Sequence, residues 1–345
     1  MIREFIKKVG TGPHGVRDLS RSEAFEAADI LLSGQATPAQ TGALLLGLRL
    51  KGESGEEMAG FLGALNKRLP SFSSGERPDL DLGDPYDGRS RTTSLLVPAA
   101  LNAARFGLRT VLHGLSGVPV KKGPGVLEGW KAHGQTPTRL PQSGETLGKL
   151  GVVCLSQADF LPDLARLLSI RQELGLRTLF NTVEKAVNPL RAKVQLIGIF
   201  HDPVLKKLRA ACLNEGSPDP GTVLPSSFQV FVQGVEGGVD LYTHRPTICY
   251  LPDPDGGTDL LPVTIPACED DTAKLLSKEP QTDPPTLSSI LETPDSPLKL
   301  ILDRQTAFFL FVSGCFGSFS EALSAVSRLD PLPFRRHRVG DPGHA

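Results

Sequence analysis

The most informative stretch of this chain is LDLGDPYDGRSRTTSLLVPAALNAARF, residues 80–106. It begins with a short apolar run, Leu80–Gly83, that predicts a β-strand, and it ends with an Ala- and Leu-rich run, Ser94–Phe106, that predicts a helix. The turn between them, Asp84–Thr92, leads into the helix N-terminus. Such a turn commonly binds an anion, because free backbone N–H groups and the helix dipole point at it.

Two arginines in this turn strengthen the expectation of a phosphate site. Arg89 and Arg91 can form charge-assisted hydrogen bonds to a phosphate. They can also pair with the neighbouring carboxylates of Asp84 and Asp87. The sequence leaves both interpretations open.

From Leu80 onward, strand-like and helix-like segments alternate, which predicts a mainly parallel sheet with helices on both faces. The predicted strands are Leu80–Leu82, Thr110–His113, Gly151–Leu155, Val194–Phe200 and Gln229–Gln233. The predicted helices are Ser94–Phe106, Gly125–His133, Leu161–Leu174, Thr178–Val187, Pro203–Leu213 and Gln305–Arg328. In such sheets ligands bind beyond the C-terminal ends of the strands, where the Asp84 turn, His113-Gly114 and the turn Gln233–Gly238 are expected.

The first seventy residues predict a small helical domain. Three capping-box patterns mark helix starts, and Gly34 and Gly52 stand where helix C-caps belong. The capping pairs are Ser20 with Glu23, Thr37 with Gln40 and Ser54 with Glu57. We expect a helical domain over residues 1–72, joined by helices from about 161–190, then an α/β domain over 78–330 and a tail over 331–345.

Charge and cysteine content narrow the class of protein. The segment Pro252–Ser296 holds ten acidic residues and two lysines, a net charge of −8, so the rest of a chain of net charge −1 carries +7. The stretch Leu251–Lys299, which contains this segment, is rich in Pro and Asp and is expected to form long surface loops. Five widely spaced cysteines without a CxxC pair favour reduced thiols in the cytoplasm, and no apolar run is long enough to span a membrane.

Three motifs carry a resemblance to a known family. They are ATPAQTGALLLGLRLKGESGEEMAGF over Ala36–Phe61, RQELGLRTLFN over Arg171–Asn181, and Asn188-Pro189 shortly after it. Together with the order of elements, they resemble the anthranilate phosphoribosyltransferase family, also called glycosyltransferase family 3, over roughly residues 1–245. The resemblance implies a helical domain plus a larger α/β domain of the nucleoside phosphorylase and phosphoribosyltransferase type, and a homodimer formed through the helical domain.

The resemblance also implies an activity and a site. The family transfers a phosphoribosyl group to an acidic or aromatic acceptor with loss of diphosphate. The implied phosphate-binding residues are Gly83, Asp87, Gly88, Arg89, Ser90, Arg91, Thr92, His113 and Gly114. The implied acceptor-binding residues are Arg171 and Asn181. Arg171 can equally be an ion-pair partner, and His113 can simply brace the turn through a hydrogen bond to the backbone.

The site departs from the family pattern at three places. The family's phosphate turn usually reads Gly-Thr-Gly-Gly-Asp-Gly, whereas Pro85 and Tyr86 here replace two glycines, and Pro lacks an N–H donor. The family's Lys-His-Gly-Asn is reduced to His113-Gly114. The acidic pair that holds Mg²⁺ should lie near Glu236 and Asp240, where at most one acid is retained, so a magnesium site is in doubt.

Further motifs resemble a diverged paralogous branch of the family, whose members include proteins similar to nucleic-acid-binding proteins. These motifs are Asn181–Lys185, Glu236-Gly237-Gly238 and Arg245-Pro246. We therefore keep two hypotheses: a phosphoribosyltransferase-like enzyme, and a non-enzymatic nucleic-acid-binding protein. The candidate basic clusters for nucleic acid are Lys121-Lys122, Lys206-Lys207-Arg209 and Arg335-Arg336-His337-Arg338.

Overall fold

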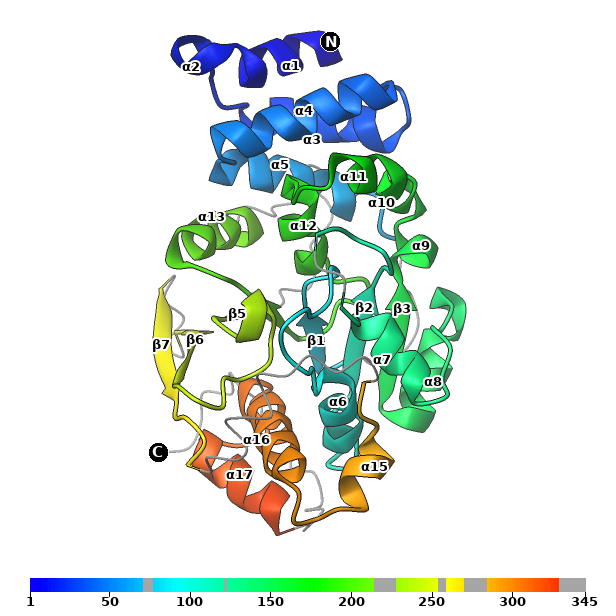
Figure 1. Cartoon of the computed structure of the whole chain (residues 1–345), viewed down its shortest axis with the longest axis vertical. Coiled ribbons are helices and arrows are strands. Elements are labelled where there is room, and N and C mark those ends of the chain that lie inside the picture. The colour runs from blue at the N-terminus through cyan, green and yellow to red at the C-terminus, as the bar shows by residue number, and fades with distance from the viewer. Residues whose placement is uncertain (71–76, 121–122, 214–227, 254–258, 270–283, 329–345) are drawn as a thin grey trace.

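The structure, a computed structural model, describes residues 1–70, 77–120, 123–213, 228–253, 259–269 and 284–328. A helical domain at the N-terminus stands on a larger α/β domain (Figure 1). The expected end of the helical domain at 72 lies outside the described residues, and the expected start of the α/β domain at 78 lies close to the same gap, so both boundaries stay predictions. The expected tail, 331–345, lies wholly outside the described residues.

The helical domain forms where the capping patterns predicted it. Its helices are α1 (Ile2–Gly10), α2 (Gly12–Gly15), α3 (Arg21–Leu32), α4 (Pro38–Lys51) and α5 (Gly55–Asn66). The N-cap hydroxyls of Ser20, Thr37 and Ser54 each accept from the backbone N–H three residues on, and all three capping boxes are complete. Gly34 and Gly52 adopt φ values of 74° and 85°, as expected for glycines that end helices.

A seven-stranded sheet forms the centre of the α/β domain. Its strands are β1 (Leu80–Gly83), β2 (Thr110–Gly114), β3 (Val152–Ser156), β4 (Val194–Gly198), β5 (Phe228–Val232), β6 (Thr247–Pro252) and β7 (Leu260–Ile265). The spatial order is β3-β2-β1-β4-β5-β6-β7. Strands β1 to β5 pair in parallel, and β6 and β7 add to the edge in antiparallel pairing, which confirms the mainly parallel sheet.

Helices cover both faces of this sheet. The α-helices are α6 (Leu96–Ala104), α7 (Val126–Ala132), α8 (Ser143–Leu150), α9 (Gln157–Phe160), α10 (Pro162–Ala165), α11 (Leu168–Leu174), α12 (Leu179–Val183), α13 (Asp202–Leu213), α15 (Leu287–Leu291), α16 (Pro297–Val312) and α17 (Phe319–Ser327). Short 3₁₀ helices are η1 (Leu140–Gln142), η2 (Glu184–Ala186) and η3 (Val235–Gly237). Among the described residues, none of these helices is both long and apolar enough to span a membrane.

Side chains that alternate along the strands enter two separate cores. Val111 belongs to a core that continues into the helical domain, whereas its neighbour Leu112 belongs to a core under α6, α16 and α17. Helices α11 and α12 pack against α4, so the two domains share apolar contacts. The sheet is thus held between two hydrophobic layers, with α16 and α6 side by side below it (Figure 1).

Two sequence predictions about the second half of the chain are wrong. The acidic segment 252–296 is not loop throughout, because its described parts contain β7 and α15. The single helix predicted over Gln305–Arg328 is two helices, α16 and α17. They are separated around Gly314, whose φ of 76° ends α16.

Candidate anion-binding site at the carboxyl edge of the sheet

The turn after β1 is shaped by glycines that no other residue can replace without a clash. A Cβ on Gly83 would lie 2.3 Å from the carbonyl oxygen of Lys185, and a Cβ on Gly88 would lie 2.3 Å from that of Gly123. Gly88 also has a φ of 71°. Next to it, the backbone N–H of Arg89 donates to the Pro124 carbonyl at 3.2 Å. The turn is thereby fixed against the segment that precedes α7.

Arg89 points inward and holds two carboxylates. Its guanidinium contacts Asp84 Oδ1 at 3.2 Å, forms a closer ion pair with Asp240 Oδ2, and donates to the Val235 carbonyl at 2.7 Å. The residue is 3% exposed. Burial opposes its charge, but the carboxylates of Asp240 and Asp84 outweigh burial and raise the pKa of Arg89 above its ordinary value. Arg89 therefore stays charged and joins the turn to the segment after β5.

Asp240 also accepts hydrogen bonds at the start of α6. Its carboxylate accepts from the Ser94 hydroxyl at 3.1 Å and from the Leu95 backbone N–H at 3.3 Å. No side chain of the residue before α6 caps this helix, so Asp240 supplies an anion to the helix N-terminus from a distant part of the chain.

Glu236 brings a carboxylate into the turn itself. It accepts from the Arg91 backbone N–H at 3.1 Å and the Ser90 N–H at 3.4 Å, and from the hydroxyls of Thr92 at 2.8 Å and Ser90 at 3.4 Å. The Arg91 guanidinium lies 3.8 Å away and is 72% exposed. The predicted residues Arg89, Ser90, Arg91 and Thr92 thus converge with both acidic candidates, Glu236 and Asp240.

This cluster does not fit a magnesium ion. The carboxylates of Asp84 and Asp240 already converge on the guanidinium of Arg89, and Glu236 is occupied by hydrogen-bond donors of the turn. Within the described ranges, no three His, Cys, Asp or Glu side chains are placed to hold a metal ion. A cation from the chain itself takes the position in which an Mg²⁺ ion would have to meet its oxygen ligands.

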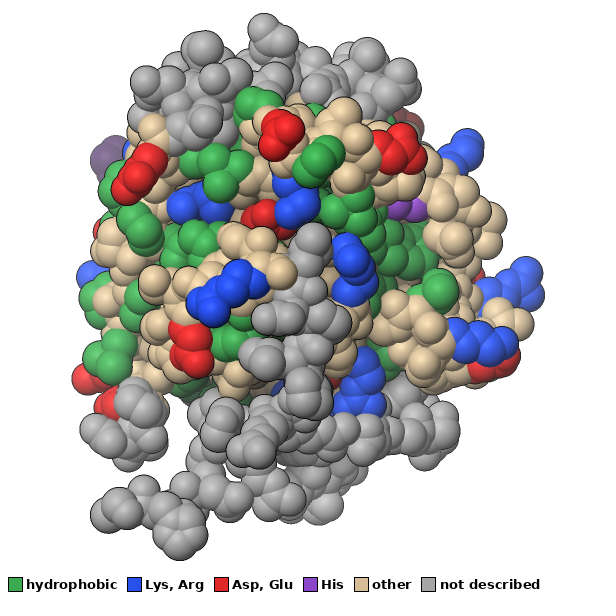
Figure 2. All heavy atoms as spheres, turned by 90° about the horizontal axis from the view of Figure 1, so that it is seen from below, with side chains coloured by type: hydrophobic (Ala, Val, Ile, Leu, Met, Phe, Trp, Pro, Cys, Tyr) green, Lys and Arg blue, Asp and Glu red, His purple; other side chains and the backbone are tan. Residues whose placement is uncertain are grey.

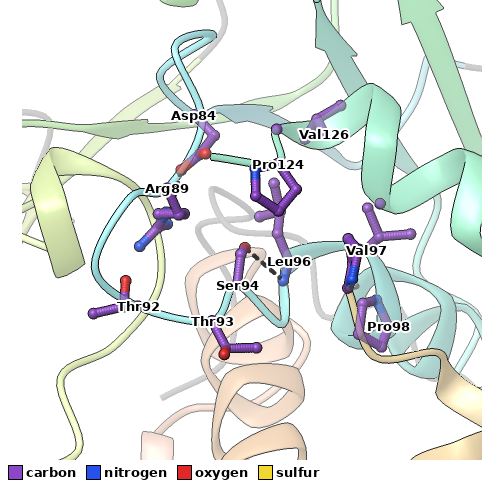
Figure 3. Close-up of a pocket in the computed structure, with 13 residues that line it drawn as sticks. Asp84, Arg89, Thr92, Thr93, Ser94, Leu96, Val97, Pro98, Pro124 and Val126 are labelled. Atoms are coloured by element: carbon purple, nitrogen blue, oxygen red, sulfur yellow. Dashed lines mark hydrogen bonds and ion pairs between the residues drawn. The ribbon is translucent and has the colours of Figure 1, made fainter. Parts of the chain in front are cut away.

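A cavity of about 20 Å³ lies beside the cluster (Figure 3). Its polar wall comes from the turn and the start of α6, and its apolar wall from α6 and the segment before α7. The residues that form its walls include Asp84, Arg89, Thr92, Ser94, Leu96, Val97, Pro124 and Val126. The volume is about that of one water molecule.

His113 lies behind the turn in a buried chain of hydrogen bonds. Its Nε2 is 3.1 Å from Asp81 Oδ1, and its Nδ1 hydrogen-bonds the Tyr86 hydroxyl. His113 and Asp81 are fully buried, and burial raises the pKa of the Tyr86 hydroxyl well above its ordinary value. His113 therefore braces the turn, as one of its two sequence interpretations stated, but it does so through side chains. The neighbouring Gly114 lies beside Tyr86 and His113 at the end of β2.

The two acceptor candidates lie apart from this cluster. Arg171 forms a bidentate ion pair with Glu184, two bonds of 2.8 Å between side chains that are 0% and 1% exposed. Its Nε has no hydrogen-bond partner among the described residues. Asn181 Oδ1 accepts from the backbone N–H of Thr178, the N-cap of α12, and the Asn181 amide nitrogen donates to the Pro119 carbonyl at 2.9 Å. Neither residue lines the cavity.

Sequence reasoning missed several partners of the site. Asp87 pairs with Arg177, whose Nη2 lies 2.6 Å from Asp87 Oδ2. Asp81 was also missed, although a charged residue within a short apolar strand is a readable signal of a buried polar network. Glu184 could not be recognised as the partner of Arg171, because this pairing depends on three-dimensional packing.

The basic clusters proposed for nucleic acid gain no support from the described residues. Lys121-Lys122 and Arg335–Arg338 fall outside them, and Lys207 Nζ donates to the Glu53 carbonyl at 2.6 Å. On the face opposite the helical domain, basic and acidic side chains are interspersed (Figure 2). Mixed charge of this kind is typical of an ordinary solvated surface.

The chain is similar in sequence to known proteins. Residues 3–68 match the family model described as the helical bundle domain of a glycosyl transferase family. The chain is 31% identical over 248 residues to an uncharacterized protein of Aquifex aeolicus, which covers 72% of this chain and 73% of the relative. It is 31% identical over 260 residues to the anthranilate phosphoribosyltransferase of Desulfitobacterium hafniense, which covers 70% of this chain and 76% of the relative.

Two solved structures share the fold. The anthranilate phosphoribosyltransferase of Thermus thermophilus matches with a TM-score of 0.71 at 22% identity, over 94% of this chain and 93% of that one. The Saccharomyces cerevisiae enzyme, in complex with PRPP and Mg, matches with a TM-score of 0.72 at 16% identity, over 95% and 92%. The likeness extends over both domains and confirms the predicted combination of a helical and an α/β domain.

Proposed function

The chain belongs to the anthranilate phosphoribosyltransferase family of glycosyltransferases, and from that membership we propose that it transfers a phosphoribosyl or related glycosyl group. The donor would carry a diphosphate or phosphate leaving group, and the acceptor would be a small acidic or aromatic molecule. The relatives named above as anthranilate phosphoribosyltransferases support this class of reaction.

The proposal depends on how the turn after β1 binds a carboxylate. Two backbone N–H groups and two hydroxyls, from Ser90 to Thr92, converge on one carboxylate. A phosphate accepts hydrogen bonds from the same kinds of donor, and the turn stands at the carboxyl edge of a parallel sheet. The exposed guanidinium of Arg91 adds a positive charge at the same place. We assign the donor's phosphate groups to this turn.

The other residues have supporting roles in this proposal. Arg89, held by Asp84 and Asp240, keeps the turn in position, and His113 braces Tyr86 from behind. Catalysis would depend on orientation and on stabilising the charge of the departing phosphate group, with Arg91 as the contacting cation.

Arg171 and Asn181 carry the acceptor part of the proposal. Glu184 accepts one hydrogen bond from each terminal nitrogen of Arg171, and the Nε–H, which has no hydrogen-bond partner among the described residues, is the donor that we assign to an acidic acceptor. The amide nitrogen of Asn181 is engaged by the Pro119 carbonyl, which positions the end of α12 near that segment.

The proposal extends to the compartment and the assembly of the protein. All five cysteines are free thiols, as expected in the reducing cytoplasm. Leu50 on α4 is 78% exposed and offers apolar area on the helical domain for a homodimer. Sedimentation equilibrium of the full chain would contradict the dimer by showing only monomer mass.

Replacement of Arg91 tests the proposed donor site. Arg91→Ala should weaken binding of phosphoribosyl diphosphate about tenfold, the size of one lost charge-assisted hydrogen bond. It should leave the thermal midpoint nearly unchanged, because the side chain is exposed. Calorimetric titration and release of diphosphate in the presence of anthranilate are the measurements.

Arg3→Ala is the matched control, since Arg3 is an exposed arginine on α1 in the helical domain and its loss changes the net charge equally. The assignment fails if Arg91→Ala and Arg3→Ala bind and turn over the donor equally well.

A further inference from the structure

We propose that the carboxylate of Glu236 occupies the phosphate-binding site of the donor, and that a phosphorylated donor binds only by displacing this carboxylate. This inference rests on the proposed function of the turn after β1. It assigns to Glu236 a control over which ligands enter that site.

The contacts of Glu236 are those that a phosphate group would make. Its two carboxylate oxygens take the backbone N–H groups of Ser90 and Arg91 and the hydroxyls of Ser90 and Thr92 at 2.8–3.4 Å. The Glu236 side chain is 3% exposed, whereas Ser90 and Arg91, which carry three of the four donors, lie at the surface of the protein. A phosphate and the carboxylate cannot share the same donors, because both are anions and both need the hydrogen atoms.

The backbone of Glu236 is in an unfavourable conformation. It has φ 53° and ψ 25°, the left-handed region that side chains with a Cβ rarely adopt. The flanking Gly234 and Gly238 approach each other closely, since a Cβ on Gly234 would lie 2.3 Å from the Gly238 carbonyl oxygen. Such a conformation persists where surrounding contacts hold it, and here they include the contacts of the carboxylate with the turn.

The cavity beside the turn does not itself offer room for the donor. The adjoining cavity of about 20 Å³ accommodates about one water molecule, far less than a diphosphate requires. The other acidic groups are not available to move aside, because Asp84 and Asp240 are buried against Arg89. Glu236 is the acidic group whose departure would vacate hydrogen-bond donors of the turn.

Charge then selects the ligand. A monocarboxylate offers the turn only what Glu236 already supplies, whereas a phosphate dianion or diphosphate brings more negative charge to the same donors and to Arg91. The site is thus expected to bind phosphate esters and diphosphates, and not to bind simple carboxylates.

Two variants of Glu236 test this inference. Glu236→Gln removes the charge and keeps the size, and Glu236→Gly removes the side chain and suits the positive φ. Each should bind inorganic diphosphate and phosphoribosyl diphosphate about tenfold more tightly than wild type in calorimetric titrations.

Glu128→Gln is the matched control. Glu128 also accepts from a backbone N–H, that of Gly125 at 2.9 Å, and from the Ser116 hydroxyl at 2.6 Å, and its loss changes the net charge equally. Its affinity for diphosphate should stay within about twofold of wild type. Circular dichroism verifies that each variant is folded.

The outcomes separate this inference from the proposed function. Tighter binding by both Glu236 variants, with Glu128→Gln unchanged, supports the inference. Binding by wild type with no gain in either variant overturns it and leaves the donor site standing. If neither wild type nor variants bind phosphoribosyl diphosphate or diphosphate, both the inference and the proposed function are wrong.

Discussion

Loss of the guanidinium of Arg171 should destabilise the protein strongly, because it leaves a buried carboxylate without its main partner. In Arg171→Met the side chain keeps an apolar body of similar length, but Glu184 loses two bonds of 2.8 Å in a place where it is 1% exposed. Removal of one partner of a buried ion pair costs about 3–5 kcal/mol. We expect a loss of stability of that size.

Urea unfolding followed by tryptophan fluorescence measures this loss in the α/β domain. The chain has one tryptophan, Trp130, which is buried in α7. The double variant Arg171→Met/Glu184→Met should recover most of the stability, since an apolar pair of similar volume replaces the ion pair without an uncompensated charge.

The same pair of variants separates a structural from an acceptor-binding role of Arg171. If its Nε contacts the acceptor, the double variant should be folded and should bind anthranilate about tenfold more weakly than wild type, the size of one lost hydrogen bond to a charged group. A loss of less than about 1 kcal/mol of stability in Arg171→Met would show that the ion pair between Arg171 and Glu184 does not stabilise the fold as we expect.

Two further predictions concern buried polar groups. Burial raises the pKa of the Tyr86 hydroxyl, so the unfolded chain releases this proton at a lower pH than the folded chain does. Wild type should therefore lose stability as pH rises above about 10, and Tyr86→Phe should lose less. Equal slopes of stability against pH for the two proteins in urea unfolding would contradict the buried, protonated state of Tyr86. Glu57 is fully buried, receives Lys51 Nζ at 2.7 Å and accepts from the Leu19 N–H at 2.9 Å. Glu57→Ala should cost about 3–5 kcal/mol in a denaturation followed by far-UV circular dichroism, and a loss below about 1 kcal/mol would contradict its role.

Local signals explain which elements could be predicted from the sequence. The three capping boxes are pairs of residues three apart, and β1 to β5 are short apolar runs between turns, so each is recognisable within a few residues. Strands β6 and β7 were missed because Pro252 and Pro262 lie in them within an acidic, Pro-rich segment. Proline is tolerated there because Pro262 lies in β7, the edge strand, and Pro252 is the last residue of β6.

The start of α16 was readable but was placed too late. Ser296 caps it and Pro297 occupies its first turn, a combination typical of a helix start. The prediction began at Gln305 because the apolar stretch is densest there.

Sequence located the turn but not the internal ligands that fill it. Ser90, Arg91 and Thr92 were recognised as anion-binding residues, and the structure places their donors together. Their partner Glu236 is about 145 residues away in the chain, and nothing in the local pattern indicates that contact. The inward direction of Arg89, toward Asp240, depends in the same way on how the segment after β5 returns to the turn.

Calorimetric titration of wild type with phosphoribosyl diphosphate, in excess EDTA and again with Mg²⁺, measures whether the chain binds the donor and whether it needs a metal ion to do so. We expect saturable binding of one donor per chain at the turn after β1. We also expect binding to persist in EDTA, because Arg89 holds the carboxylates that a magnesium ion would need. Absence of saturable binding under both conditions, together with tight and strongly salt-dependent binding of single-stranded DNA, would contradict the proposed donor site.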